Sequence, residues 1–165
     1  MRLILLALSL LAISSMSAVS AAPAGAEHPD ARPFEQDADA MAQVDAALVR
    51  AERSDKRVLL VMGANWCHDS RGLSGWLAEP RFAEMLEAKY EVVYIDVCYP
   101  QRGEGCNIAI AQRFGIQSIK GTPTVLILSA QGLLLNRKSA PKWRNAASRS
   151  EEEIYVYFDE FVPES

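Results

Sequence analysis

The chain has 165 residues, half of them hydrophobic, which is enough for one globular domain. Its formal charge of −4 argues against a nucleic-acid-binding protein. Its two histidines, His28 and His68, lack zinc-ligand spacing, so no metal site is expected. We also expect no cofactor.

Residues 1–22 are typical of a signal peptide. Arg2 is followed by an apolar run from Leu3 to Ile13 and then by small residues up to Ala22. The run is too short to span a bilayer, so no membrane span is expected. We therefore predict a periplasmic or secreted protein in an oxidising compartment.

Residues 23–36 contain several prolines and few large apolar side chains, which predicts a mobile linker. The domain is then expected at 37–163. Apolar residues at helical spacing predict helices in this domain. We expect them at 37–53, where Met41, Val44, Leu48 and Ala51 form the buried stripe, at 68–78, from Pro80 onward, at 108–114, and from Ser150 onward, where Ser150 and Glu153 form a capping box.

Short apolar runs predict the strands, namely Val58–Met62, Val92–Val97, Thr124–Leu128 and Leu133–Arg137. The first two strands are joined by a helical crossover and should be parallel. The last two should form an antiparallel hairpin. Glycines at 72 and 75 weaken the second helix and would let another backbone come close.

The stretch Trp66-Cys67-His68-Asp69-Ser70 lies where the first predicted strand ends and a helix begins. Free N–H groups and the helix dipole favour an anion at that place. Because the thiolate is the reactive form of cysteine, Cys67 is predicted to be a nucleophile. The alternative is a buried structural cysteine.

This motif, together with Gly121-Thr122-Pro123-Thr124 before an apolar strand, resembles the thioredoxin superfamily. The resemblance implies an α/β thioredoxin fold, with a central mixed sheet flanked by helices, here preceded by an extra N-terminal helix. It also implies a cis Pro123 beside the nucleophile and a Thr122 backbone that is offered to an extended substrate; the alternative is a trans proline at the start of an edge strand. Trp66 and His68 are expected to contact the substrate as well.

The chain departs from the family at Ser70, where the family has its resolving cysteine, and at Val61, where thioredoxins have a buried aspartate. A hydroxyl cannot attack a disulfide, but it can donate a hydrogen bond to the Cys67 thiolate. We therefore expect a catalytic pair, Cys67 and Ser70, that works by a monothiol route. The thiol that releases the substrate from its mixed disulfide with Cys67 must be the substrate's own, that of glutathione as a co-substrate, or a second cysteine of this chain.

Cys98 and Cys106 flank a polar loop that follows a predicted strand. In an oxidising compartment we expect a structural disulfide, worth roughly 2–3 kcal/mol by loop entropy. The alternatives are a resolving partner for Cys67, a second redox centre, or two reduced thiols. A basic run is expected to be a solvated face, with an anionic partner as the alternative; it consists of Arg137, Lys138, Lys142, Arg144 and Arg149.

Taken together, these features predict a thiol–disulfide exchange protein that acts on thiol- or disulfide-containing proteins or on glutathione. The alternative is a binding module that holds partners in a groove at Cys67 and Pro123 with little or no turnover.

Overall fold

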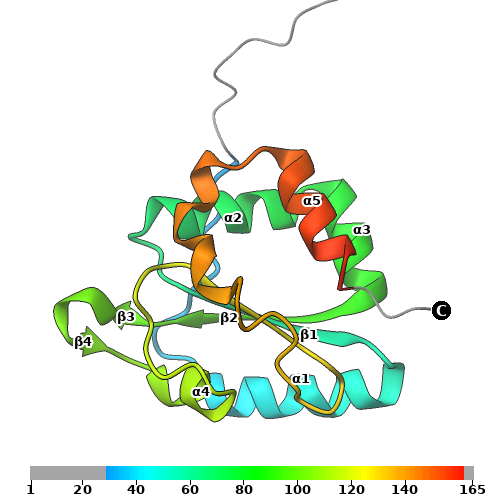
Figure 1. The fold of residues 1–165 in the computed structure, drawn as a ribbon, viewed down its shortest axis with the longest axis horizontal. Helices are drawn as coiled ribbons and strands as arrows, with labels where there is room; N and C mark the ends of the chain where they lie inside the picture. The colour runs from blue at the N-terminus through cyan, green and yellow to red at the C-terminus, as the bar shows by residue number, and fades with distance from the viewer. Residues whose placement is uncertain (1–28, 162–165) are drawn as a thin grey trace, which may run out of the picture.

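A central sheet with helices on both faces makes up the described part of the chain, residues 29–161 of the computed structural model (Figure 1). The predicted signal peptide and residues 23–28 of the predicted linker lie outside this part. The elements are α1 (Ala40–Ser54), β1 (Arg57–Gly63), α2 (His68–Ala78), α3 (Pro80–Lys89), β2 (Tyr90–Asp96), β3 (Cys98–Tyr99), the 3-10 helix η1 (Pro100–Arg102), β4 (Glu104–Gly105), α4 (Ile108–Arg113), β5 (Thr124–Leu128), the 3-10 helix η2 (Ala140–Ser148) and α5 (Glu151–Asp159). None of the helices in this part is long and apolar enough to cross a membrane.

The main sheet has the order β2-β1-β5, with β1 in the centre. β1 runs parallel to β2, from the pair Arg57–Tyr90 to the pair Gly63–Asp96. It runs antiparallel to β5. The predicted α/β fold with a mixed sheet is confirmed.

Alternating side chains of β1 enter two different cores because successive residues of a strand point to opposite faces. Val58, Leu60 and Met62 pack with α1 and α4 on one face. Leu59 and Val61 pack on the other face with α2, α3, η2 and α5. Figure 1 shows α1 and α4 on one side of the sheet and α2, α3 and α5 on the other.

Helix α1 begins at Ala40, three residues later than expected, because Asp39 is its N-cap and accepts a hydrogen bond from the backbone N–H of Ala42. Val44 and Ala51 of the predicted stripe are buried, but Met41 is 36% exposed. Ala40 and Ala47 are buried in its place. The prediction for Met41 was wrong, and the buried face of the helix is narrower and built mainly from alanine.

The segment 29–36 packs against the domain, so the predicted mobile linker is wrong for this segment. Phe34 is 2% exposed and its ring lies edge-on to Tyr94, with the ring centroids 5.7 Å apart. The side chain of Asn65 holds the Phe34 backbone by accepting from its N–H and donating to its carbonyl. The backbone of Pro29 lies against Gly75, where a Cβ would come within 2.3 Å of it. The predicted close approach at Gly75 is thus confirmed.

The predicted strand Leu133–Arg137 was wrong, because only one bridge forms, between Leu128 and Leu134. The cause is Asn136, whose side chain is buried against β5. Its amide accepts a hydrogen bond from the Ile127 N–H and donates one to the Val125 carbonyl, both at 2.9 Å. Two backbone hydrogen bonds also join the segments, from the Ser129 N–H to the Leu133 carbonyl and from the Leu135 N–H to the Ile127 carbonyl. Beyond them the Asn136 side chain replaces the backbone ladder on the outer edge of β5.

Candidate active site around Cys67

Cys67 is the N-cap residue of α2, four residues after the end of β1. Its backbone is extended, and its carbonyl accepts the N–H of Arg71, which closes the first turn of the helix. The first N–H groups of a helix have no partner inside the helix, so they favour negative charge beside residue 67. Cys67 is 9% exposed, so a partner can reach its sulfur only by inserting a segment into the surface beside Cys67.

The thiol of Cys67 joins the two sequence motifs. Its Sγ donates a hydrogen bond of 3.2 Å to the carbonyl oxygen of Thr122. The Thr122–Pro123 peptide bond that follows is cis. The sulfur therefore lies between the N-terminus of α2 and the carbonyl of Thr122.

Ser70 does not make the hydrogen bond to Cys67 that we expected. Its side chain is fully buried, and its Oγ has no hydrogen-bond partner among the described residues. The oxygen lies instead against the backbone of Gly63, 2.7 Å from where a Cβ would be, in a region that the ring of Phe34 also occupies. The reason is the position of residue 70 on the inner side of α2, facing the sheet.

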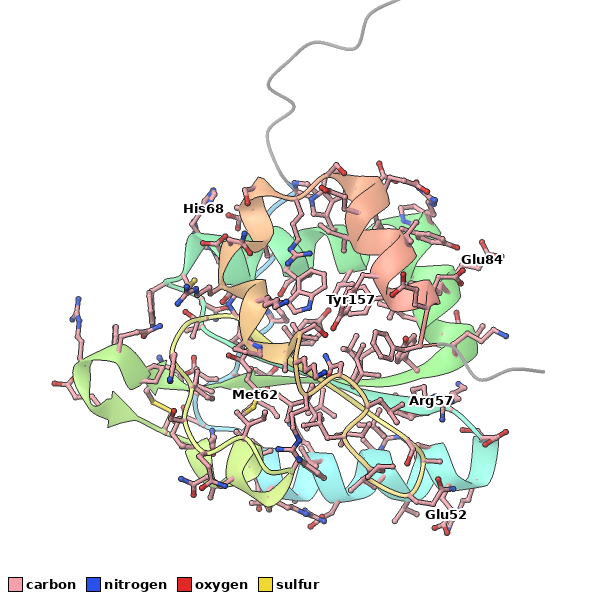
Figure 2. All side chains as sticks on the ribbon, viewed as in Figure 1. Glu52, Arg57, Met62, His68, Glu84 and Tyr157 are labelled. Atoms are coloured by element: carbon pink, nitrogen blue, oxygen red, sulfur yellow. A yellow bond between two sulfur atoms is a disulfide. The ribbon has the colours of Figure 1, made fainter. Side chains whose placement is uncertain are left out.

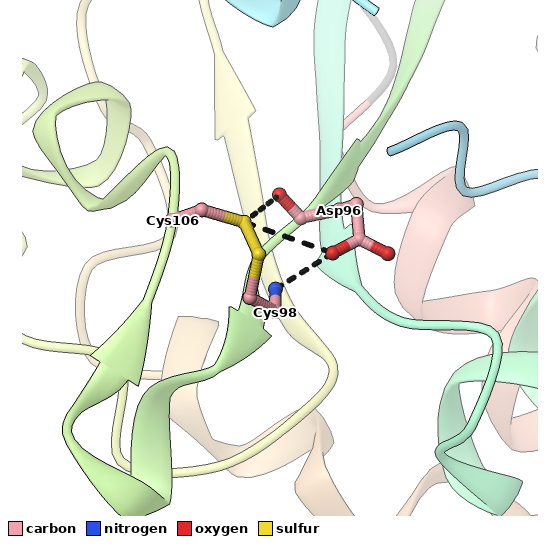
Figure 3. A group of neighbouring side chains, drawn as sticks. All are labelled: Asp96, Cys98 and Cys106. Atoms are coloured by element: carbon pink, nitrogen blue, oxygen red, sulfur yellow. Dashed lines mark hydrogen bonds between the residues drawn. A yellow bond between two sulfur atoms is a disulfide. The ribbon is translucent and has the colours of Figure 1, made fainter. Parts of the chain in front are cut away.

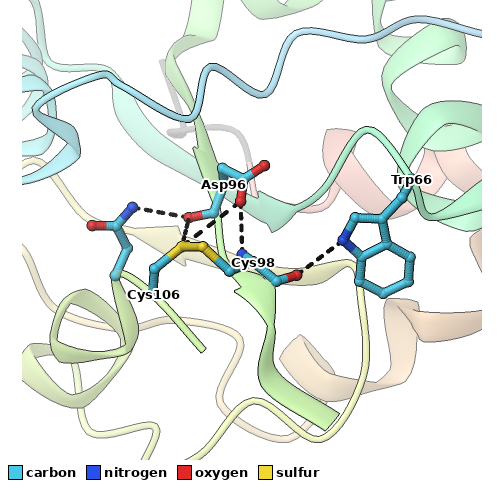
Figure 4. Close-up of a disulfide and its surroundings, with 5 residues drawn as sticks. Trp66, Asp96, Cys98 and Cys106 are labelled. Atoms are coloured by element: carbon cyan, nitrogen blue, oxygen red, sulfur yellow. Dashed lines mark hydrogen bonds between the residues drawn. A yellow bond between two sulfur atoms is a disulfide. The ribbon is translucent and has the colours of Figure 1, made fainter. Parts of the chain in front are cut away.

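Trp66 lies beside the nucleophile and is 43% exposed. Its Nε1 donates a hydrogen bond of 3.0 Å to the carbonyl oxygen of Cys98 (Figure 4). Its ring stacks on Tyr99 with the centroids 5.2 Å apart. Trp66 is therefore held by the loop between Cys98 and Cys106.

A disulfide joins Cys98 and Cys106 and closes the small hairpin of β3 and β4. Asp96, which is 2% exposed, lies directly beside it (Figure 3). The carboxylate Oδ1 accepts a hydrogen bond of 2.7 Å from the Cys98 N–H and lies 3.7 Å from Cys106 Sγ. A disulfide sulfur has no proton to donate, so the second distance is a contact. These three residues bring a carboxylate and two sulfurs within 4.8 Å of one another, but the bonded sulfurs offer no thiolate to a metal.

A cleft of about 420 Å³ opens at the nucleophile, and we call it the Cys67 groove. Its lining comes from four parts of the chain: Trp66, Cys67, Tyr99, Gln101, Arg102, Gly121, Thr122 and Arg144. Among the predicted contact residues, Trp66 and Thr122 line the groove, whereas His68 and Pro123 do not. Figure 2 shows His68 at the surface at the start of α2, pointing outward.

Sequence reasoning missed most of the groove wall. Tyr99 and Arg102 belong to a loop that we had treated only as the span of a disulfide. Arg144 belongs to the basic run, and its position in η2 could not be read from a segment without apolar periodicity. The charge of that run was the one available signal.

Arg71 fixes the backbone that leads into Cys67. Its guanidinium donates to the carbonyls of Asn65 and Trp66 at 3.3 and 3.2 Å. It also donates to the carboxylate of Asp30 at 2.7 Å, and this hydrogen bond lowers the pKa of Asp30. Arg71 thus ties the segment 29–36 to the active-site loop.

Val61 is fully buried and apolar, so no carboxylate lies at its position in the core.

Comparisons with known proteins agree with this fold. A family model described as thioredoxin-like matches residues 39–130. The crystal structure of a disulphide isomerase from Xylella fastidiosa Temecula1 is similar with a TM-score of 0.70 and 32% sequence identity, and the match covers 79% of this chain and 96% of that chain. A search of curated proteins gives no match.

Proposed function

Because the chain belongs to the thioredoxin-like family, we propose that it carries out thiol–disulfide exchange with Cys67 as its single nucleophile. One observation carries the proposal. Of the three cysteines in the chain, Cys98 and Cys106 are bonded to each other, and Cys67 alone is free, at a helix N-terminus on the wall of a groove.

In the first step the Cys67 thiol loses its proton to solvent, and the thiolate attacks one sulfur of a partner's disulfide. A new bond forms between Cys67 Sγ and that sulfur, and the partner's S–S bond breaks. The other partner sulfur leaves as a thiolate and takes up a proton. The number of disulfides is unchanged, so no outside oxidant or reductant is needed.

Release of the partner requires a thiol that the active-site motif does not contain, because residue 70 is a serine and its oxygen is turned toward Gly63. Either the partner's own freed thiol attacks the mixed disulfide, which produces isomerisation, or glutathione does so as a co-substrate. Cys98 and Cys106 are bonded to each other and serve the structure in this proposal.

We assign the protein to an oxidising compartment such as the periplasm, with disulfide-containing proteins as its partners. The disulfide between Cys98 and Cys106 supports such a compartment. So does the similarity to a protein described as a disulphide isomerase, together with the signal-peptide pattern of residues 1–22.

A second candidate is a binding module that holds partners in the Cys67 groove without turnover. The observation in its favour is the low exposure of Cys67 and the hydrogen bond from its thiol to Thr122, since both favour an unreactive thiol. The absence of a resolving cysteine at residue 70 agrees with either candidate.

An isomerisation assay on a scrambled multi-disulfide protein, with and without glutathione, distinguishes thiol–disulfide exchange from the binding module. We expect turnover in glutathione that is abolished by Cys67→Ser, and covalent adducts of Cys67 when glutathione is left out. A complex that forms equally well with Cys67→Ser, without turnover, would support the binding module instead.

A further inference from the structure

Two arginines stand on the wall of the Cys67 groove, and they come from different parts of the chain. Arg102 is in η1 and Arg144 in η2, and both are exposed. The guanidinium of Arg102 lies 5.1 Å from the centroid of the Tyr99 ring. The aliphatic part of Arg144 packs on Gly121, where a Cβ would come within 2.8 Å of it. Each side chain is therefore held near the groove by packing.

Neither arginine forms an ion pair with a carboxylate within residues 29–161. Other arginines of the same part do, such as Arg50 with Glu91, Arg81 with Glu151 and Glu152, and Arg113 with Asp45. The carboxylate of Asp69, two residues after the nucleophile, accepts a hydrogen bond from the Ala147 N–H and does not line the groove.

Arg102 and Arg144 give the groove a positive charge, whereas the formal charge of the whole chain is −4. A locally positive groove in an acidic protein attracts anionic partners and repels cationic ones at the place where the reaction occurs. The planar guanidinium also matches a carboxylate with two parallel hydrogen bonds, so arginine adds geometric selection to the attraction.

We propose that the groove selects protein segments in which acidic residues flank the reactive disulfide, with their carboxylates on Arg102 and Arg144. The inference rests on thiol–disulfide exchange at Cys67, for which it names the substrate class. The exchange step is unchanged: Cys67 Sγ bonds one sulfur of the segment, the S–S bond breaks, and the second sulfur leaves as a thiolate.

The test uses three disulfide-linked peptides that differ only in the residues beside the disulfide, which are glutamate, glutamine or lysine. Mass spectrometry measures the rate at which each forms an adduct with Cys67 on the full chain, at low and high salt. Each rate is divided by the rate of alkylation with iodoacetamide for the same variant, which removes any change in thiolate content. We expect the glutamate peptide to react roughly tenfold faster than the lysine peptide at low salt, with the ratio falling at high salt.

The double variant Arg102→Glu with Arg144→Glu should reverse this order. The matched control is Arg53→Glu, an exposed arginine at the end of α1, before β1, whereas Cys67 follows β1. It changes the net charge in the same direction, and we expect it to leave the order intact.

The outcomes distinguish a failure of acidic-segment selection from a failure of thiol–disulfide exchange at Cys67. If no peptide forms an adduct although iodoacetamide alkylates Cys67, thiol–disulfide exchange itself is wrong. If the three peptides react at equal rates, exchange stands and the selection of acidic segments is overturned. A dependence on the two arginines that appears only with glutathione disulfide would also overturn it, since the occupant would then be a small thiol.

Discussion

The indole of Trp66 donates a hydrogen bond of 3.0 Å to the carbonyl of Cys98, which connects the residue beside the nucleophile to the loop closed by the disulfide. Stacking of Trp66 on Tyr99 in the same loop adds a second contact. The shape of the Cys67 groove therefore depends on a covalent bond that takes no part in the proposed exchange step.

Opening this disulfide should loosen the groove wall. In the variant Cys98→Ser with Cys106→Ser, we expect Trp66 to become more accessible to iodide quenching of its fluorescence, and the free energy of unfolding to fall by roughly 2–3 kcal/mol. The other two tryptophans, Trp76 and Trp143, are less exposed than Trp66, and the variant Trp66→Phe gives their contribution. Unchanged quenching would show that the loop holds Trp66 without the disulfide.

Removing the hydroxyl of Ser70 should stabilise the protein. A buried polar group without a partner loses its hydration and gains nothing in return, so Ser70→Ala should raise the free energy of unfolding by roughly 1 kcal/mol in urea denaturation. The control is Ser74→Ala one turn later, where the hydroxyl donates to the Ser70 carbonyl at 2.8 Å. That change should cost roughly 1 kcal/mol. Equal effects of the two changes would mean that Ser70 has a partner after all.

Replacing Asn136 should be far more damaging than replacing an exposed asparagine. Asn136→Ala leaves the Ile127 N–H and the Val125 carbonyl without partners at the edge of β5. We expect a loss of roughly 2–4 kcal/mol in the free energy of unfolding. Asn145→Ala, at an exposed position of η2, serves as the control and should change it by less than about 0.5 kcal/mol. A similar loss in both variants would refute the role of the Asn136 amide.

The attachment of the segment 29–36 should depend on pH through Asp30. The hydrogen bond from Arg71 lowers the pKa of Asp30 in the folded state, so the carboxylate contributes stability above the unfolded pKa of about 4 and loses it as the pH falls through the lowered folded value. The difference in free energy of unfolding between the native chain and Asp30→Asn should therefore be larger at pH 7 than at pH 3. A difference that grows on acidification would contradict this sign.

Much of the fold could be predicted from local patterns. The parallel pairing of β1 with β2 follows from apolar runs and a helical crossover, and the capping box at Ser150 is local in sequence and appears as predicted. The prediction failed where long-range packing decides the structure. Phe34 is one aromatic side chain in a segment rich in proline, and only its pocket beside Asn65 and Tyr94 orders it.

The candidate site could likewise be predicted only in part. Cys67 at a helix start and its approach to Thr122 could be predicted from two motifs. The orientation of Ser70 could not, because it depends on which side of α2 faces the sheet. The positions of Arg102 and Arg144 on the groove could not be predicted either, because η1 and η2 are brought together there only by the fold.

The central claim is that Cys67 works without a resolving thiol at residue 70, and it is tested most directly by the lifetime of a Cys67 mixed disulfide. The adduct is formed by exchange of Cys67 with a disulfide-linked peptide, which releases the other half of the peptide as a thiol. The free peptide is then removed, and release of the adduct is followed without glutathione in the native chain and in Ser70→Cys. The larger sulfur fits poorly in the space between Gly63 and Phe34, so it should turn toward Cys67. We predict an adduct that persists in the native chain until glutathione is added, and rapid release in Ser70→Cys. Equal release in both proteins without glutathione would contradict the monothiol route.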